Sequence, residues 1–208
     1  EMALPTALTV FNRSMINLEN EITRLKSFEL NSTVVKNNNF NIIYYKKGTI
    51  KTSETTPENW YDQYKLNLKT ENKAILKRSS FTINSDNNAL NIKSFDSDGK
   101  FIKSYSFSSL STSSISHDLP FDLTIYSDKS ISFEREIIFN SVDFQTNKFK
   151  KKLKIKPLGN DSDQLSVTLT HSNVDIAKSY LNELIKSFDN DGVIDKQLAY
   201  SRTIEFVN

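Results

Sequence analysis

Hydrophobic residues recur at helical spacing near the start of the chain. Three of them lie at positions i, i+4 and i+7, with charged residues on the other face: Leu18, Ile22 and Leu25. This spacing predicts an amphipathic helix over residues 15–28. A second, short helix is predicted over 32–37, because Ser32 at its start is a favoured N-cap residue.

A wider apolar stripe marks a longer helix in the last part of the chain. Its members share one helical face: Ile176, Ala177, Tyr180, Leu181, Leu184, Ile185 and Phe188. They predict a helix over 173–190, capped by Asn173 and ended or kinked at Asn190-Asp191-Gly192. Beyond it, residues step by four, three, four and three positions: Val193, Gln197, Tyr200, Ile204 and Val207. Such steps are typical of a coiled-coil seam.

Alternation of apolar and polar residues predicts strands elsewhere. It predicts half-buried strands over 153–157 and 165–170, and a run of β-favouring residues predicts another strand over 40–46. From about 52 to 146 the chain consists of short β-like runs separated by polar turns. These runs cover 81–83, 90–92, 101–107, 119–126 and 130–139. Asp98-Gly99, which lies between two of them, favours a hairpin turn.

Together these elements predict an α+β fold. We expect a mixed sheet packed against amphipathic helices, with an inserted β-rich lobe and the start of a C-terminal coiled coil. The predicted organisation is an α/β domain made of residues 1–54 and 146–208, interrupted by a β-rich subdomain over 55–145. The helix over 173–190 is expected to cover the strand over 165–170, because a strand with one apolar face needs a partner.

Composition limits what such a fold can do. The chain has 208 residues, enough to bury a stable core without disulfides or structural metals, and 14 Phe and 8 Tyr supply large apolar groups. Basic residues exceed acidic ones by only 27 − 25 = 2, so no general attraction to nucleic acid is expected. The lack of cysteine removes disulfides, thiolate nucleophiles and cysteine zinc sites. Both ends fall in mid-pattern, so we expect the sequence to be part of a longer protein.

No residue pattern matches a catalytic, cofactor or metal site. The four glycines are too scattered for a phosphate loop, and both Asp-Gly segments lack the outer carboxylates of a calcium loop. Isolated histidines and acid pairs are interpreted as structural or solvated: His117, His171, Glu134/Glu136 and Asp161/Asp163. Only folding could unite them in a metal, triad or glycosidase site. We therefore predict no catalytic residue, no cofactor and no metal.

A run of lysines is the first candidate for a contact with a ligand. Its members are Lys148, Lys150, Lys151, Lys152, Lys154 and Lys156. On a strand, Lys152, Lys154 and Lys156 would share one face, available to a phospholipid headgroup or an acidic glycan, while Leu153 and Ile155 face the core. The interpretation that we prefer is a lysine-protected strand face or edge.

An aromatic group is the second candidate. Trp60, Tyr61 and Tyr64 lie close together in the sequence and could stack on a sugar. Packing into the core is the commoner role of such residues and remains the preferred interpretation.

Segments at both ends of the chain, taken together, resemble a known family. The first set is Leu18-Glu19-Asn20-Glu21-Ile22, Leu25-Lys26-Ser27, Val34-Val35-Lys36 and the segment 41–54. The second set is Phe149-Lys150-Lys151-Lys152-Leu153, Ala177 and the segments 165–169, 180–185 and 195–206. In order and spacing they resemble the periplasmic domain of polysaccharide co-polymerases, the chain-length-determinant proteins of the Wzz/Wzc type. The nearest likeness is to capsular or exopolysaccharide tyrosine autokinases of the Bacteroidetes type. Between about 55 and 142 only the β-rich character matches.

The resemblance implies a periplasmic, non-catalytic assembly domain of an inner-membrane protein that regulates the chain length or export of a capsular or exopolysaccharide. It implies a homo-oligomeric ring in the full-length protein. The implied partners are a polysaccharide polymerase, an outer-membrane export protein and the polysaccharide itself, with no nucleic acid. Any tyrosine kinase activity would belong to a cytoplasmic domain outside this sequence. The alternative is a stand-alone carbohydrate-binding or adhesin-like β domain with the aromatic residues near Trp60 as its platform.

Overall fold

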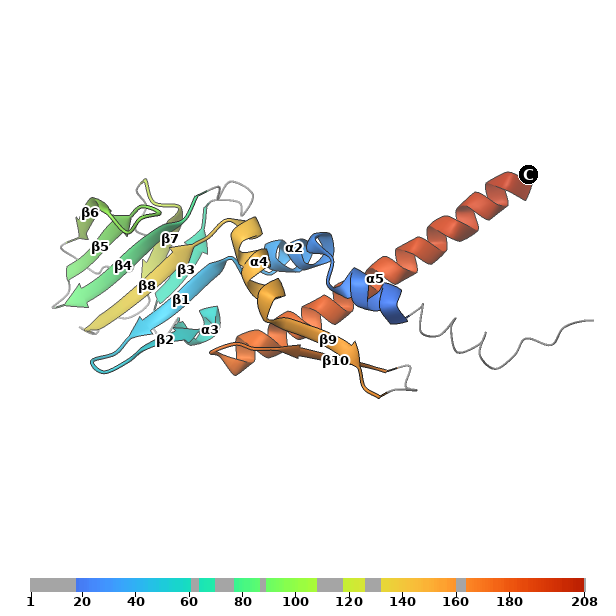
Figure 1. The fold of residues 1–208 in the computed structure, drawn as a ribbon. Coiled ribbons are helices and arrows are strands. Elements are labelled where there is room, and N and C mark those ends of the chain that lie inside the picture. The colour runs from blue at the N-terminus through green and yellow to red at the C-terminus, as the bar shows by residue number, and fades with distance from the viewer. Residues whose placement is uncertain are drawn as a thin grey trace, which may run out of the picture.

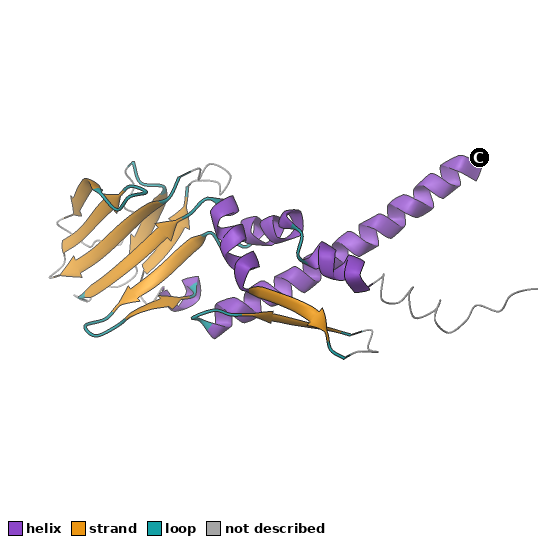
Figure 2. Ribbon diagram, viewed as in Figure 1, coloured by secondary structure: helices purple, strands orange, loops and turns teal. Residues whose placement is uncertain are grey.

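The computed structural model divides the chain into two modules (Figure 1). It describes residues 18–60, 64–69, 77–86, 89–107, 118–125, 132–159 and 164–207. We call residues 42–139 the β lobe, and residues 18–40 together with 142–192 the helical module. The β lobe lies at one end of the molecule and the helical module in the middle, and strands and helices are largely segregated between them (Figure 2).

The β lobe contains two antiparallel sheets that share one core. The larger sheet has the order β2-β1-β8-β4-β5-β6. Its strands are β1 (Ile42–Lys47), β2 (Thr52–Thr55), β4 (Ser79–Asp86), β5 (Ala89–Phe95), β6 (Phe101–Phe107) and β8 (Phe133–Phe139). The smaller sheet pairs β3 (Tyr64–Leu68) with β7 (Phe121–Ile125), and a short helix α3 (Pro57–Trp60) follows β2. The described pairings are all antiparallel, so the predicted mixed sheet is wrong.

Period-two alternation places one face of each sheet in the core of the β lobe. Fully buried members of this core come from both sheets: Ile83, Leu90, Ile92, Phe121, Leu123 and Ile137. The Phe81 ring meets the rings of Phe121 and Phe139 edge-on, with centroids 5.3 and 5.7 Å away. Edge-on pairs of this kind add to the stabilisation that burial provides.

The predicted hairpin between β5 and β6 is confirmed. Gly99 adopts a positive φ of 78°, which costs glycine little because it has no Cβ. The Asp96 carboxylate accepts hydrogen bonds from the backbone N–H groups of Asp98 and Lys100, at 2.9 and 2.8 Å. The Asp-Gly segment is therefore a turn, as the sequence suggested.

The helical module packs helices and one hairpin around a second core. It contains a helix over 18–25, α2 (Phe28–Asn37), α4 (Val142–Lys152), β9 (Leu153–Pro157), β10 (Leu165–Leu169) and α5 (Val174–Val207). The buried members of this core are Leu25, Leu30, Val34, Val35, Phe149, Leu153, Ile155, Tyr180 and Leu184, and partly buried residues of β10 pack against them. The apolar stripe of α5 and the inner residues of β10 belong to the same cluster, so the predicted packing of this helix on that strand is confirmed. The α+β class is confirmed as well.

The bend between the first two helices lies earlier than predicted. The Ser27 hydroxyl accepts a hydrogen bond from the backbone N–H of Leu30 and caps α2, which therefore begins at Phe28. The predicted cap, Ser32, lies inside this helix. Both serines have suitable chemistry, and the tertiary position of the bend decides between them.

Helix α4 replaces the first part of the predicted lysine strand. Ser141 caps it by accepting a hydrogen bond from the backbone N–H of Phe144, and Lys152 is its last residue. Lys152 therefore does not share a strand face with Lys154 and Lys156. The helix has a weak apolar pattern because two of its buried residues, Gln145 and Thr146, are polar.

Helix α5 continues through the predicted break. Asn173 caps it as predicted, because its side-chain oxygen accepts hydrogen bonds from the N–H groups of Asp175 and Ile176. The helix then runs without interruption through residues 190–192 to Val207. A glycine inside a helix costs only about 1 kcal/mol, which the turns on either side outweigh. With 34 residues, α5 is about 50 Å long, and its last half projects beyond the module (Figure 1).

Strand β1 belongs to the β lobe, whereas the sequence assigned the strand over 40–46 to the α/β domain. It pairs with β2 on one side and with β8 on the other, with Ile42 opposite Phe139. The chain thus crosses between modules just before β1 and just after β8. None of the described helices is both long and apolar enough to cross a bilayer.

Candidate functional site

The candidate lysine contacts are divided between two elements. Lys154 and Lys156 are exposed on β9, while Leu153 and Ile155 are buried in the core, as the alternation predicted. Lys152 is exposed at the end of α4. On β10, Thr168 and Ser166 lie opposite the two strand lysines. The described outer face of this hairpin therefore combines lysines with hydroxyl side chains.

The candidate aromatic residues fall on separate elements. Trp60 is the last residue of α3, and Tyr64 is the first residue of β3, where it pairs with Ile125. Tyr61 lies outside the described residues, as do His117 and the Asp161/Asp163 pair.

Glu134 and Glu136 share one lysine as an ion-pair partner. Both carboxylates lie within ion-pair distance of the Lys47 ammonium group, at 3.3 and 3.7 Å. Lys47 and Glu134 face each other across β1 and β8. The two acids thus form a cross-strand charge cluster on the sheet, the kind of contact that stabilises pairing between strands.

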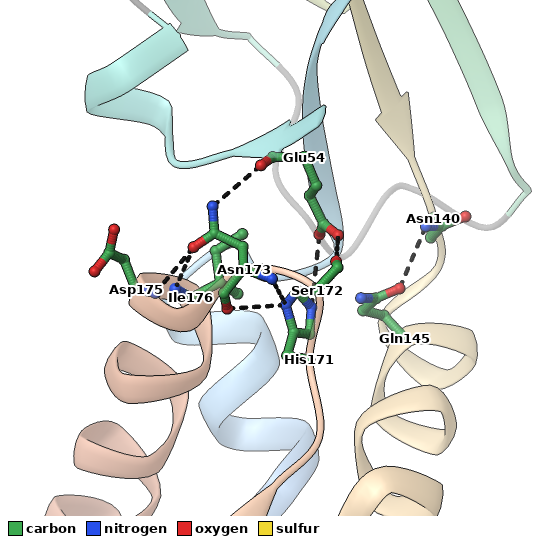
Figure 3. Close-up of polar contacts among 8 residues, drawn as sticks. All are labelled: Glu54, Asn140, Gln145, His171, Ser172, Asn173, Asp175 and Ile176. Atoms are coloured by element: carbon green, nitrogen blue, oxygen red, sulfur yellow. Dashed lines mark hydrogen bonds and ion pairs between the residues drawn. The ribbon is translucent and has the colours of Figure 1, made fainter. Parts of the chain in front are cut away.

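His171 lies in a polar cluster at the junction of the two modules (Figure 3). Its Nε2 is 3.6 Å from Oε1 of Glu54, which belongs to β2 of the β lobe. The Ser172 hydroxyl donates to the other carboxylate oxygen at 2.9 Å. The Asn173 side-chain amide donates to the backbone carbonyl of Glu54 at 3.1 Å. We call these four residues the latch, because they join β2 to the start of α5.

The contacts of the latch attach β2 to the start of α5. The Nδ1 of His171 lies 3.1 Å from the backbone nitrogen and 3.2 Å from the carbonyl oxygen of Asn173, so this edge of the ring contacts its own turn, while Nε2 faces Glu54. The ring also stacks on Phe149, with centroids 5.7 Å apart. The Ser172 hydroxyl contacts Glu54, whereas a serine nucleophile needs its hydroxyl on the histidine base.

Two buried asparagines hold the chain crossings together. The backbone N–H of Asn140 donates to the carbonyl of Asn41 at 2.9 Å, and the Asn41 side chain donates to the carbonyl of Asn140 at the same distance. The Asn140 side chain then reaches Gln145 of α4 at 3.4 Å (Figure 3). The modules are thus joined by one pair of adjacent crossings and, at a second place, by the latch.

Inside the helical module, a buried amide links three helices. Asn31 of α2 donates to the carbonyls of Leu25 and Ser27, at 2.8 and 2.7 Å, and its oxygen accepts a hydrogen bond from the Tyr180 hydroxyl of α5. Tyr180 also stacks on Phe149, with centroids 4.2 Å apart. Burial raises the pKa of the Tyr180 hydroxyl. Asn31 and Tyr180 are both fully buried.

Strand β1 carries a second tyrosine with a perturbed hydroxyl. Burial raises the pKa of Tyr45, and the carboxylates of Glu54 and Glu136, which lie on the neighbouring strands, raise it further. Arg78 acts in the opposite direction. The half-buried phenol is therefore held in its neutral, hydrogen-bonding form near the latch.

A cavity of about 610 Å³ lies between the modules beside the latch. It is lined by the turn after α2, by β1, β2, α3 and β3 of the β lobe, and by α4 and α5. Glu54 belongs both to the latch and to this lining.

No protein-family model matches this chain, and no curated protein matches it. The family resemblance therefore depends on the sequence segments given above. What it implies for function is a proposal.

Neither the latch as a whole nor the buried amides could be predicted from the sequence. Glu54 lies in a polar segment, and Asn31, Asn41 and Asn140 look like ordinary turn or cap residues. A weak signal exists for Asn31, because it lies between apolar residues that share a buried helix face. The latch has no such local signal, because its two halves are 118 positions apart.

Proposed function

We propose that this chain is a periplasmic, non-catalytic assembly domain of an inner-membrane polysaccharide co-polymerase, which regulates the chain length or export of a capsular or exopolysaccharide. One observation carries the proposal. Segments that resemble this family come from both ends of the sequence, and most of them lie together in the helical module. The segments over 18–36 form the first two helices, 149–153 joins α4 to β9, 165–169 is β10, and 180–185 lies on α5.

The mechanism would be geometric. Helix α5 is continuous from its packed half to its projecting half. Neighbouring copies that pair through the projecting half would therefore also hold their helical modules in a fixed position relative to one another. The positions with seam spacing, 193–207, lie entirely on that half. The β lobe is fastened to the helical module by the two crossings and the latch, and would move with it.

Cross-linking of the full-length protein in membranes tests this proposal. The chain has no cysteine, so a single introduced cysteine is a clean reporter. Gln197→Cys lies on the predicted seam and should give covalent dimers under mild oxidation, because equivalent positions of a parallel coiled coil face each other. Asp195→Cys, on the opposite side of the same helix, is the matched control and should give far fewer.

A functional readout accompanies the cross-link. Replacing Ile204 on the seam with Asp should weaken assembly and change the length distribution of the surface polysaccharide on gels. Equal cross-linking at both cysteine positions, or a normal length distribution with a monomeric protein, would contradict the proposal.

A further inference from the structure

The cavity between the modules has the size and position of a ligand site. Small-molecule sites typically measure about 300–1,000 Å³ and are common where two domains meet. This cavity measures about 610 Å³ and is bounded by both modules. It does not coincide with the lysine hairpin or with the seam of α5.

The lining is rich in neutral hydrogen-bonding groups. Amide and hydroxyl side chains from both modules contribute: Asn38, Asn39, Asn67, Thr56, Gln145 and Ser179. Apolar and aromatic surfaces alternate with them: Phe40, Tyr44, Leu66, Leu68, Phe149 and Ile176. A ligand with many hydroxyl groups and an apolar C–H face complements such a surface, because amides both donate and accept hydrogen bonds.

The charges in the lining favour an uncharged ligand. Among the described lining residues, none is Lys, Arg or His, and two are acidic, Glu54 and Glu58. An anionic ligand would face these carboxylates with no cation among the described lining residues to offset them, which opposes its binding. Both carboxylate oxygens of Glu54 are already engaged in the latch. Glu58 is exposed, and an exposed single carboxylate attracts a cation only weakly.

Several walls of the cavity are fixed in advance. The Phe40 ring packs against Phe149 and Tyr180, with centroids 5.9 and 5.5 Å away. Asn39 has a φ of 56° and ends α2 in the left-handed conformation, which turns the chain so that Asn38 and Asn39 both line the cavity. A preformed site loses less conformational entropy when a ligand binds.

We propose that this cavity binds a neutral sugar unit, a mono- or disaccharide or the end of a longer glycan. This inference does not depend on the assembly function proposed above, because it is carried by the lining of the cavity alone. Neutral sugars in this partly polar site should bind with a Kd of about 1–10 mM, equivalent to about −3 to −4 kcal/mol.

NMR titration of the isotope-labelled chain tests the proposal. The probes are glucose, galactose, mannose, N-acetylglucosamine and lactose, with glucuronate and spermidine as charged comparators. We expect at least one neutral sugar to shift the amide signals of Asn38, Asn67 and Ser179 in a saturable way. Glucuronate and spermidine should leave these signals in place.

Two variants connect binding to the cavity. Ser179→Trp puts a large side chain at the lining and should weaken sugar binding at least about tenfold, a change of about 1.4 kcal/mol. Asn182→Trp is the matched control, because it is also exposed on α5 but does not line the cavity, and binding should persist. Asn67→Leu removes one amide from an exposed position and should weaken binding without changing the circular dichroism spectrum.

Three results would overturn the proposal. The first is that no neutral sugar shifts the lining amides. The second is that the shifts persist unchanged in both Ser179→Trp and Asn67→Leu. The third is that only glucuronate or spermidine binds, which would assign the cavity to a charged ligand.

Discussion

The contact between Asn31 and Tyr180 gives the sharpest test of how the helical module is held together. Tyr180→Phe removes the hydroxyl that donates to the Asn31 oxygen, in a place that solvent does not reach. One buried acceptor is left without its partner, which costs about 1–2 kcal/mol. Asn31→Ala leaves two groups without a partner, the Tyr180 hydroxyl and the Leu25 carbonyl, and should cost about 3 kcal/mol.

The double variant carries the test. With both side chains truncated, neither the Asn31 oxygen nor the Tyr180 hydroxyl remains to be buried alone. The double variant should therefore be about as stable as Asn31→Ala, and the two single losses should fail to add by about 1–2 kcal/mol, the loss of Tyr180→Phe alone.

Urea unfolding followed by far-ultraviolet circular dichroism measures these losses. The long described helices all belong to the helical module and α5, so the helical signal reports on the relevant part of the molecule. Ile92→Val in the core of the β lobe is the control, and its loss of about 1 kcal/mol should add to that of Asn31→Ala. If the losses at Asn31 and Tyr180 also add to within about 0.5 kcal/mol, the two side chains do not act as a unit and the reasoning is wrong.

Three further predictions concern pH, the latch and assembly. The folded state raises the pKa of Tyr180 above its unfolded value of 10.0. The stabilisation that the neutral Tyr180 hydroxyl provides is therefore complete below pH 10 and is lost as the pH rises above it. Between pH 9 and pH 11, the urea midpoint should fall by less in Tyr180→Phe than in the unaltered chain. Asn173→Ala removes both the helix cap and the hydrogen bond that the side-chain amide donates to the Glu54 carbonyl, whereas Asn173→Asp keeps the cap. Hydrogen exchange at the first turn of α5 should therefore accelerate in Asn173→Ala by a factor equivalent to about 1 kcal/mol and change little in Asn173→Asp, unless the cap contributes nothing. Light scattering of the 208-residue chain at micromolar concentration should show a monomer or weak association. Its seam has only about two heptads, whereas stable coiled coils need three or four. A tight oligomer would mean that the sheets, and not the seam, hold the copies together.

Local patterning determined a large part of the secondary structure. The hairpin around Gly99, the strands over 101–107 and 165–169 and the cap at Asn173 could all be predicted, because each depends on a few neighbouring residues. A strand with one buried face shows period-two alternation, and a capped helix shows its cap, whatever the rest of the chain does.

The tertiary structure decided which elements belong together. Helix α4 escaped prediction because Gln145 and Thr146 are buried without being apolar, so its sequence lacks a clear stripe. Strand β1 joined the β lobe because its partner β8 lies about ninety residues further along the chain. The Asn31–Tyr180 contact and the latch span 149 and 118 positions. A sequence pattern records how each segment meets solvent and core, but pairing between distant segments depends on the free energy of the whole fold, which no local window contains.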